Sequence, residues 1–144
     1  GTYQFFIWDG ERTLESPDAN TLGFDDDFSP PRLFHRLRRN PEWQRLWSER
    51  ARRHLGAGGA LSPEAGAARF RSLADQIDLA VIAESARWGD YRRDVHRYKE
   101  GPYELYTRDE HWRPEIHRIL RDFFPQRSVF FREQSRISGL SIGD

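Results

Sequence analysis

The sequence contains no cysteine and no methionine. Without cysteine there is no disulfide framework, no thiolate nucleophile and no cysteine-ligated zinc. No apolar stretch approaches the ~20 residues that a membrane-spanning helix needs, so we expect no membrane insertion by this segment. Common catalytic signatures are also missing: there is no phosphate-binding glycine loop, and the five histidines form no HExxH or similar metal-ligand spacing.

The chain also lacks a net charge, because its 23 basic side chains equal its 23 acidic ones. A neutral total argues against nucleic-acid binding, which depends on a positive surface. The charges are unevenly distributed, however. Residues 1–27 carry seven acids against one base, and residues 31–54 carry eight arginines against two glutamates. We expect these two oppositely charged segments to lie against each other.

Each charged segment allows a functional interpretation, but a simpler one is favoured. Asp25, Asp26 and Asp27 are ligands of the kind that hard cations prefer, yet their spacing lacks the pattern of a calcium loop, which favours a solvated acidic loop. The arginine-rich stretch 31–55 has the outline of a helix-turn-helix, but its tryptophans and leucines occupy one face. Solvated arginines that pair with local acids are therefore favoured over phosphate contacts.

Length and composition fit a single globular domain or lobe that spans residues 1–144, with 37% hydrophobic and 32% charged residues. The hydrophobic periodicity predicts a mainly α fold, with one short N-terminal strand followed by about five helices. The strand and a turn occupy residues 1–12, and a loop pinned by Leu22, Phe24 and Phe28 occupies residues 13–29. The helical part, residues 30–144, contains predicted helices at about 30–39, 41–55, 62–88, 107–124 and 126–138.

Local signals set the predicted helix ends. Ser62 followed by a proline is a strong start signal, and Gly139 is a typical stop. Pro114 is expected to kink or split the fourth helix, and Pro125 to end it. Between the third and fourth helices, residues 89–106 are expected to form an irregular connection with a helical turn near 90–98.

The predicted helix at 62–88 carries one apolar stripe at spacings of three and four, which we expect to be buried. Its members are Phe70, Leu73, Ala74, Ile77, Val81 and Trp88. Glu84 falls on the same stripe, and a buried carboxylate needs a partner. We expect Arg87, one helical turn away, to supply it.

Asp9 is the main candidate functional residue. It ends the strand-like aromatic run Tyr3–Trp8 and precedes Gly10. An aspartate followed by glycine after such a run is also an ordinary turn signal, and the local pattern alone favours the turn. The alternative is that the strand presents Asp9 as a metal ligand, because carboxylates at strand ends are held in a fixed position.

A resemblance gives weight to the metal-ligand alternative. The segments FFIWDGERTLE, PRLFHRLRRNPEWQRLWSERARRHL, LADQIDLAVIAESARWGDYRRD and FFPQRS with the later SGL together resemble the C-terminal region of CotH-family proteins, which are atypical kinases of the spore-coat type. The similarity runs in order through nearly the whole chain. It implies the C-terminal lobe of a larger α+β kinase-like fold, and an extracellular or cell-surface location.

The resemblance also implies a role for two residues. The family's metal-binding aspartate corresponds to Asp9. Glu11 is a weaker candidate for the metal site, near enough to orient a metal-bound water or Arg12. Mg and ATP are implied as cofactors of the full-length protein, because phosphoryl transfer depends on neutralising phosphate charge. The partners implied are a protein substrate and an N-terminal lobe that lies upstream.

The sequence departs from a complete family member because the nucleotide-clamping lysine, the glycine-bearing segment and the catalytic aspartate would all precede residue 1. A lone strand also cannot pair with itself. We therefore expect a fragment of a longer protein that does not bind ATP tightly or turn over by itself. The alternative is a helical interaction or scaffold module without chemistry, in a multi-domain bacterial surface or secreted protein.

Overall fold

The computed structural model describes residues 10–26, 28, 30–98 and 101–142. This part of the chain is mainly helical, as predicted, and contains no strand. The predicted strand falls on residues 1–9, which lie outside the described residues, and Gly10–Arg12 forms the 3-10 turn η1. The α-helices are α1 (Pro30–Leu37), α2 (Pro41–Leu55), α3 (Pro63–Ile77), α4 (Ala80–Trp88), α5 (Arg113–Arg118) and α6 (Phe124–Ile137).

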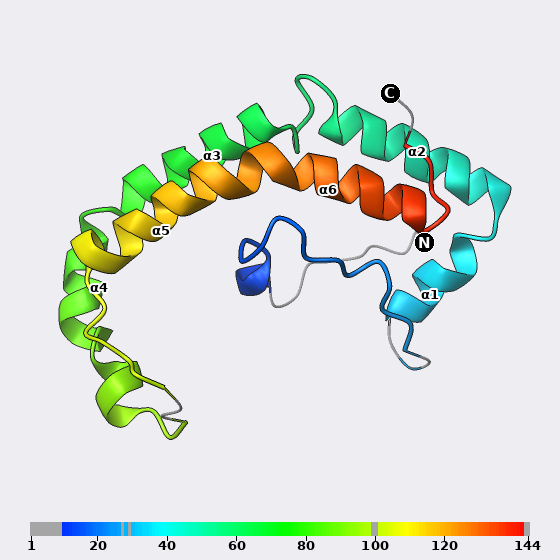
Figure 1. Ribbon diagram of the computed structural model, residues 1–144. Helices are drawn as coiled ribbons and strands as arrows, with labels where there is room; N and C mark the ends of the chain where they lie inside the picture. The colour runs from blue at the N-terminus through cyan, green and yellow to red at the C-terminus, as the bar shows by residue number, and fades with distance from the viewer. Residues whose placement is uncertain (1–9, 27, 29, 99–100, 143–144) are drawn as a thin grey trace, which may run out of the picture.

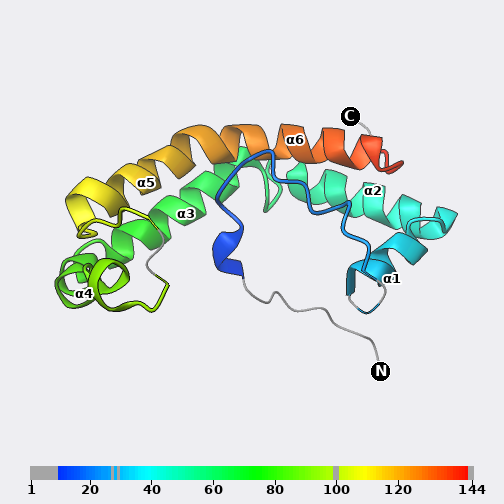
Figure 2. The same ribbon diagram turned by 60° about the horizontal axis from the view of Figure 1, so that its bottom comes forward.

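The helices form a long curved structure with two layers (Figure 1). α2 and α3 follow each other along one layer, and α5 and α6 run along the other. α1 and α4 lie at opposite ends of the arch. The N-terminal segment 10–26 lies on the concave side, and the rotated view shows it crossing beside α6 toward α1 (Figure 2). The arch therefore carries this segment along its inner side.

One uninterrupted helical stretch, from Arg108 to Ile137, forms the second layer. It contains the π-helical segments η3 (Arg108–Trp112) and η4 (Ile119–Phe123), each of which immediately precedes an α-helix with proline in its first turn. Proline lacks an N–H donor and its ring crowds the preceding turn, whereas a π turn widens the helix. The prediction that Pro125 ends a helix was therefore wrong, and Pro114 changes the helix type without splitting it.

The predicted helix at 62–88 is divided in two. α3 ends at Ile77 and α4 begins at Ala80, and the chain changes direction between them (Figure 1). Asp78 and Leu79 keep right-handed helical backbone angles, so the bend involves no strained residue. The bonds that Asp78 makes across the structure accompany the bend, as described below.

Several predicted helix ends are confirmed by their hydrogen bonds. Asn40 Oδ1 accepts from the backbone N–H groups of Glu42 and Trp43 at 2.9 and 3.1 Å, and Ser62 Oγ accepts from that of Ala65 at 3.3 Å. These are N-caps that satisfy otherwise unpaired donors. Farther along the chain, residues 91–95 form the π turn η2 within the irregular connection, as expected.

The end of α6 is a Schellman motif. Gly139 has a φ of 77°, its N–H donates to the Arg136 carbonyl at 3.0 Å, and the Leu140 N–H donates to the Ser135 carbonyl at 2.8 Å. This pair of bonds closes a helix when glycine adopts the left-handed conformation. The chain then turns back beside α2 (Figure 1), where Arg52 Nε donates to the Ile142 carbonyl at 3.4 Å.

The apolar core of the described residues is small. Its buried apolar side chains are Ala74, Ile119, Phe123, Leu140 and Ile142, of which Leu140 is fully buried. A second, half-buried cluster joins α1, α2 and α6 through the rings of Phe34, Trp43, Trp47 and Phe131, with neighbouring centroids 5.3 to 5.9 Å apart. Ala74 of α3 and the buried Ile119 and Phe123 of η4 belong to the contact between the layers, where α3 packs on α6 and on η4.

Much apolar surface stays uncovered. Leu73 and Ile77, which were expected in a buried stripe, are 57% and 50% exposed. That expectation was wrong because an apolar face on a helix does not show whether the same chain covers it.

Candidate functional site

Asp9, the proposed metal ligand, lies outside the described residues. The weaker candidate Glu11 belongs to the 3-10 turn η1, but its side chain is also outside the description. Among the described residues, no group of three or more histidine, aspartate or glutamate side chains converges so as to hold an ion. The structure therefore leaves both metal-ligand assignments as predictions.

Residues 14–19 are held against the helical stretch from Arg108 to Ile137, called the long helix below. Side chains of the long helix donate hydrogen bonds to the backbone carbonyls of residues 14–19. Arg118 Nη2 donates to the Leu14 carbonyl at 3.0 Å, and Arg127 Nη1 donates to the Pro17 and Ala19 carbonyls, each at 2.9 Å. Gln134 Nε2 completes the series by donating to the Asp18 carbonyl at 2.7 Å. Three side chains of one helix thus fix residues 14–19.

This arrangement corrects the expectation that apolar side chains pin the loop. Phe24 is 63% exposed and Phe28 is fully exposed, whereas Leu22 is half-buried. Backbone carbonyls need partners wherever water is excluded, and arginine supplies several donors from one side chain. The sequence gives no local sign of these bonds, because each joins residues more than 100 positions apart.

The two oppositely charged segments meet at Asp25 and α1. Arg32 Nη1 lies 2.8 Å from Asp25 Oδ1, and His35 Nδ1 lies 4.0 Å from Asp25 Oδ2. The hydrogen bond from Arg32 lowers the pKa of Asp25 below its ordinary value. This contact joins the acidic loop to the first turn of α1, so the expectation that the segments lie together is confirmed at this point.

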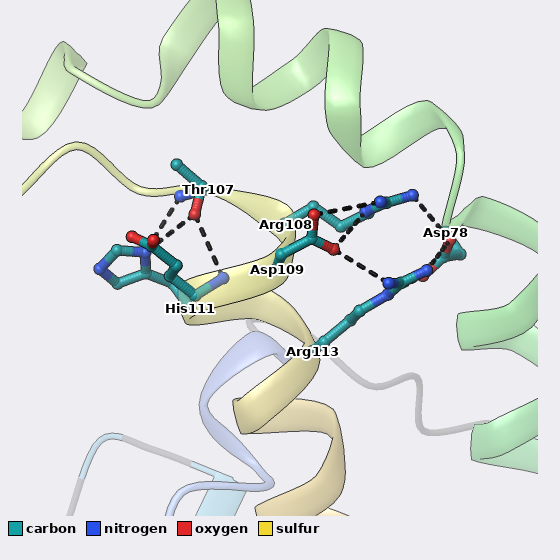
Figure 3. Close-up of polar contacts among 7 residues, drawn as sticks. Asp78, Thr107, Arg108, Asp109, His111 and Arg113 are labelled. Atoms are coloured by element: carbon teal, nitrogen blue, oxygen red, sulfur yellow. Dashed lines mark hydrogen bonds and ion pairs between the residues drawn. The ribbon is translucent and has the colours of Figure 1, made fainter.

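The densest polar cluster lies at the bend between α3 and α4, where side chains of η3 and α5 reach Asp78 (Figure 3). Arg113 binds Asp78 through two nitrogens, at 2.7 and 2.8 Å, and Arg108 Nη1 lies 3.1 Å from the same carboxylate. Asp109 bridges the two arginines, at 2.9 Å from each. The four charges alternate in sign and sum to zero.

The Asp78 cluster is built to hold helices together. Both oxygens of Asp78 accept bonds from arginine, and the side chain is only 22% exposed. The bond from Arg113, followed by the nearby charges of Arg113 and Arg108, lowers the pKa of Asp78. A carboxylate with occupied oxygens and a lowered pKa is a poor proton acceptor. We therefore assign the cluster a structural role.

A second polar group begins beside it. The Thr107 hydroxyl caps η3 by accepting from the Glu110 N–H at 3.2 Å. His111 Nδ1 accepts from the Thr107 N–H at 3.1 Å (Figure 3). The Nε2 atom of His111 lies 3.1 Å from Glu104 Oε2. Because Nδ1 accepts, the ring proton belongs on Nε2, where it is donated to Glu104. Neither nitrogen is left to act on a substrate.

The expected pair between Glu84 and Arg87 is absent from the described part of the chain. Glu84 is exposed, so it needs no buried partner, and the Arg87 guanidinium lies 5.1 Å from the centroid of the Trp88 ring. The prediction of a buried ion pair was wrong. Glu84 is exposed as Leu73 and Ile77 are, although Ala74 of the same predicted stripe is buried.

The Asp78 cluster predicts a specific pH dependence of stability. The folded-state pKa of Asp78 is lowered, so the stabilisation that it provides is present above the unfolded value, near 3.8, and is lost as the pH falls through the folded value. The thermal midpoint of Asp78→Asn should therefore lie below that of the unmodified protein at pH 7, and the gap should shrink below about pH 3.8. A gap that is the same at pH 3 and pH 7 would show that the charge of Asp78 contributes nothing.

Comparison with known proteins yields no relative: no protein-family model matches the chain, and no curated protein or solved structure matches it.

Proposed function

We propose that this chain is the C-terminal lobe of a CotH-like protein kinase, inactive as an isolated segment, which supports ATP-dependent phosphoryl transfer in the full-length protein. The observation that carries the proposal is the uncovered apolar surface of the arch. On α3, on α4 and in the two-residue link between them, the exposed fraction lies between 49% and 76% for four side chains: Leu73, Ile77, Leu79 and Ile82. Several large apolar side chains exposed within ten residues are typical of a segment that another body covers.

This chain has the features that we expect of a lobe that packs on another lobe. Its own core is small, yet its helices are fixed by caps, by the Asp78 cluster and by the anchored segment 14–19. Rigid secondary structure with an uncovered apolar face needs a second body to exclude water from that face. The N-terminal lobe that the sequence resemblance implies would supply this body.

The anchored segment supports the proposed position of Asp9. Residues 14–19 are bound to the long helix, so the chain that leads back to Asp9 starts from a fixed point. Arg12 adds a local constraint, because its Nε lies 2.8 Å from Glu15 Oε1. Functional groups perform best on elements that are held by a surrounding shell. In this proposal the helices serve as the platform beneath the site.

Mg and ATP are part of the proposal only for the full-length protein. When bound, the metal would neutralise charge on the nucleotide phosphates. Asp9 would hold it, with Glu11 as the weaker candidate. The described residues contain no ion-binding group of their own, so the remaining ligands would come from other parts of the protein.

The second candidate function is a non-catalytic helical interaction or scaffold module. The same uncovered surface favours it, because a partner protein covers an apolar face as well as a second lobe does. The polar side chains described above also fit a scaffold, because their bonds hold the structure together and do not leave reactive groups free. The described helices contain no span that is long and apolar enough to cross a membrane.

One measurement distinguishes the kinase function from the scaffold function. The full-length protein is incubated with radiolabelled ATP and Mg²⁺, and phosphate transfer to itself or to a generic protein substrate is followed. The kinase proposal predicts transfer by the full-length protein and none by residues 1–144 alone. If the full-length protein binds no nucleotide but forms a stable complex with another protein, the scaffold function replaces the kinase function.

A further inference from the structure

An aromatic hollow lies where α4 meets η3, the first turn of α5 and the segment just before η3. Its volume is about 420 Å³, within the range of small-molecule sites. Three large rings line it, those of Trp88, Tyr106 and Trp112. Trp88 is 48% and Tyr106 is 42% exposed, so both rings are accessible from solvent. The hollow is separate from the Asp78 cluster, whose side chains do not belong to its described lining.

The walls of this aromatic hollow are held in place by the protein itself. The Tyr106 N–H donates to the Gly89 carbonyl at 2.9 Å, which fixes the segment before η3 on the end of α4. Gly89 is buried, and a side chain at this position would collide with the Tyr106 carbonyl, so glycine permits the close approach. The Tyr106 ring also meets the His111 ring edge to face, with centroids 5.1 Å apart. A ligand would therefore find its aromatic contacts already arranged.

The charge inside the aromatic hollow is negative. Two glutamates line it, and among the described residues no lysine or arginine does so. Glu115 is neutralised by Arg118, which binds its carboxylate at 2.6 and 2.7 Å. Glu84 is exposed, and no described side chain forms a hydrogen bond or ion pair with it. The uncompensated charge is therefore that of Glu84. The polar lining as a whole comprises Glu84, Ser85, Thr107, His111 and Glu115.

Aromatic faces beside an unpaired carboxylate favour a cation, and the remaining polar groups favour a cation without N–H groups. Both His111 nitrogens are engaged, and the Thr107 hydroxyl already caps η3. A primary ammonium is strongly hydrated and carries three donors, which Ser85 and one carboxylate replace poorly. A quaternary ammonium has no donor to satisfy and is attracted by ring faces. Arg87 lies 5.1 Å from the Trp88 centroid but does not line the hollow, so this contact is made outside it.

We propose that the aromatic hollow binds a small quaternary ammonium compound of the choline type. Its trimethylammonium group would lie among the rings of Trp88, Tyr106 and Trp112, and the Glu84 carboxylate would balance its charge. Both attractions act on the positive charge, so a neutral molecule of the same shape would keep only the apolar contacts. The proposal is independent of the kinase assignment, because none of its residues belongs to the proposed metal site.

Three probes of similar size test the proposal: choline, 3,3-dimethyl-1-butanol and ethanolamine. The second probe has carbon in place of the choline nitrogen and is uncharged, and the third carries a primary ammonium. Binding to the full chain is measured by isothermal titration calorimetry, with tryptophan fluorescence as a second readout because Trp88 and Trp112 line the hollow. We expect choline to bind one-to-one, with a Kd of about 1 mM or below, and at least about tenfold more tightly than either analogue.

Two substitutions place the ligand. Glu84→Gln should lower the affinity for choline about fivefold, the upper end for a partly exposed ion pair, and should leave 3,3-dimethyl-1-butanol unaffected. Trp88→Leu keeps an apolar side chain but removes a ring face, and it should also reduce the preference for choline. Glu110→Gln is the matched control, because Glu110 is an exposed glutamate of η3 that does not line the hollow. This variant should bind choline as the unmodified protein does.

Circular dichroism spectra of all three variants must match that of the unmodified protein. The comparison of choline with its two analogues needs no variant, so it decides the matter even if a variant unfolds. A peptide that contains trimethyllysine carries the same group, and at least tenfold tighter binding of this peptide would replace the small molecule by a protein partner. Three further results would each overturn the proposal: no binding of choline, equal binding of either analogue, or unchanged choline binding in a folded Glu84→Gln variant.

Discussion

Replacing Leu140 with alanine is expected to lower the free energy of unfolding by about 2–5 kcal/mol, the range measured when buried leucines are truncated. Leu140 is only 1% exposed and is among the few buried apolar side chains of the described residues. It also follows Gly139 in the Schellman motif, where its N–H donates to the Ser135 carbonyl. Removing the side chain leaves a cavity that the closed helix end cannot collapse around.

The effect is large for this chain because its core is small. Native domains are stable by only about 5–15 kcal/mol, so the substitution removes a substantial part of the total. Urea denaturation followed by circular dichroism measures the change. Ile137→Ala is the matched control, since Ile137 lies in the same helix end but is 70% exposed, and its effect should stay within about 0.5 kcal/mol. Equal effects of the two substitutions would show that the C-terminal residues do not pack as described.

Helix positions were predictable where the signal is local. Asn40 and Ser62 cap the helices that follow them because a short side chain reaches the backbone N–H groups two or three residues ahead. Gly139 ends α6 because glycine adopts positive φ without strain. Each of these helix ends depends only on residues that are close in the sequence, so the local sequence pattern is enough to predict it.

Breaks within helices were harder to predict. Pro125 is usually a stop signal, but the π turn before it lets the helix continue. Asp78 carries no stop signal, yet the chain bends beside it, and its partners Arg108 and Arg113 lie 30 and 35 residues away. The pairing of Asp109 with Arg113 could be seen at a spacing of four. The role of Asp78 in the same cluster could not be seen from the sequence, because that role depends on how the two layers pack.

Side-chain burial was the least predictable property. The spacing of Leu73 and Ile77 correctly indicates an apolar face, but the described residues leave both side chains about half exposed. Conversely, the carbonyls of the loop 14–19 are bound by Arg118, Arg127 and Gln134, which periodicity treats as ordinary polar positions. Periodicity describes one helix at a time, whereas burial is decided by what another element, or another body, places against it.

The candidate site, like the fold, has features that a sequence pattern indicated and features that no sequence pattern indicated. Asp9 was proposed from a strand-end pattern and from a family resemblance, and both the pattern and the residue lie outside the described part of the structure. The aromatic hollow had no sequence signal, because its wall combines residues from α4, η3, α5 and the segment before η3. Trp88 was predicted only as a member of a buried stripe, and Glu84 only as half of a buried ion pair. The position of Glu84 beside the aromatic rings became visible once the neighbouring elements were in place.

Asp9→Asn in the full-length protein is expected to lower phosphate transfer from ATP by at least about 100-fold, since a metal-held charge is worth several kcal/mol and each 1.36 kcal/mol is tenfold in rate. The substitution separates the two interpretations of Asp9. Asparagine accepts turn geometry as readily as aspartate, so a residue that only forms the turn with Gly10 would tolerate the change. A metal ligand would not, because the amide lacks the negative charge that Mg²⁺ prefers.

Glu11→Gln provides the matched comparison, because it removes one carboxylate from the same short segment and keeps the size of the side chain. As the weaker candidate, Glu11 should affect transfer much less than Asp9 does. Thermal midpoints of both variants must equal that of the unmodified protein, so that a loss of activity does not reflect unfolding. An unchanged rate in Asp9→Asn would refute the assignment of Asp9 as the metal ligand. A larger loss in Glu11→Gln would reverse the order of the two residues and place the metal on the helical turn rather than at the strand end.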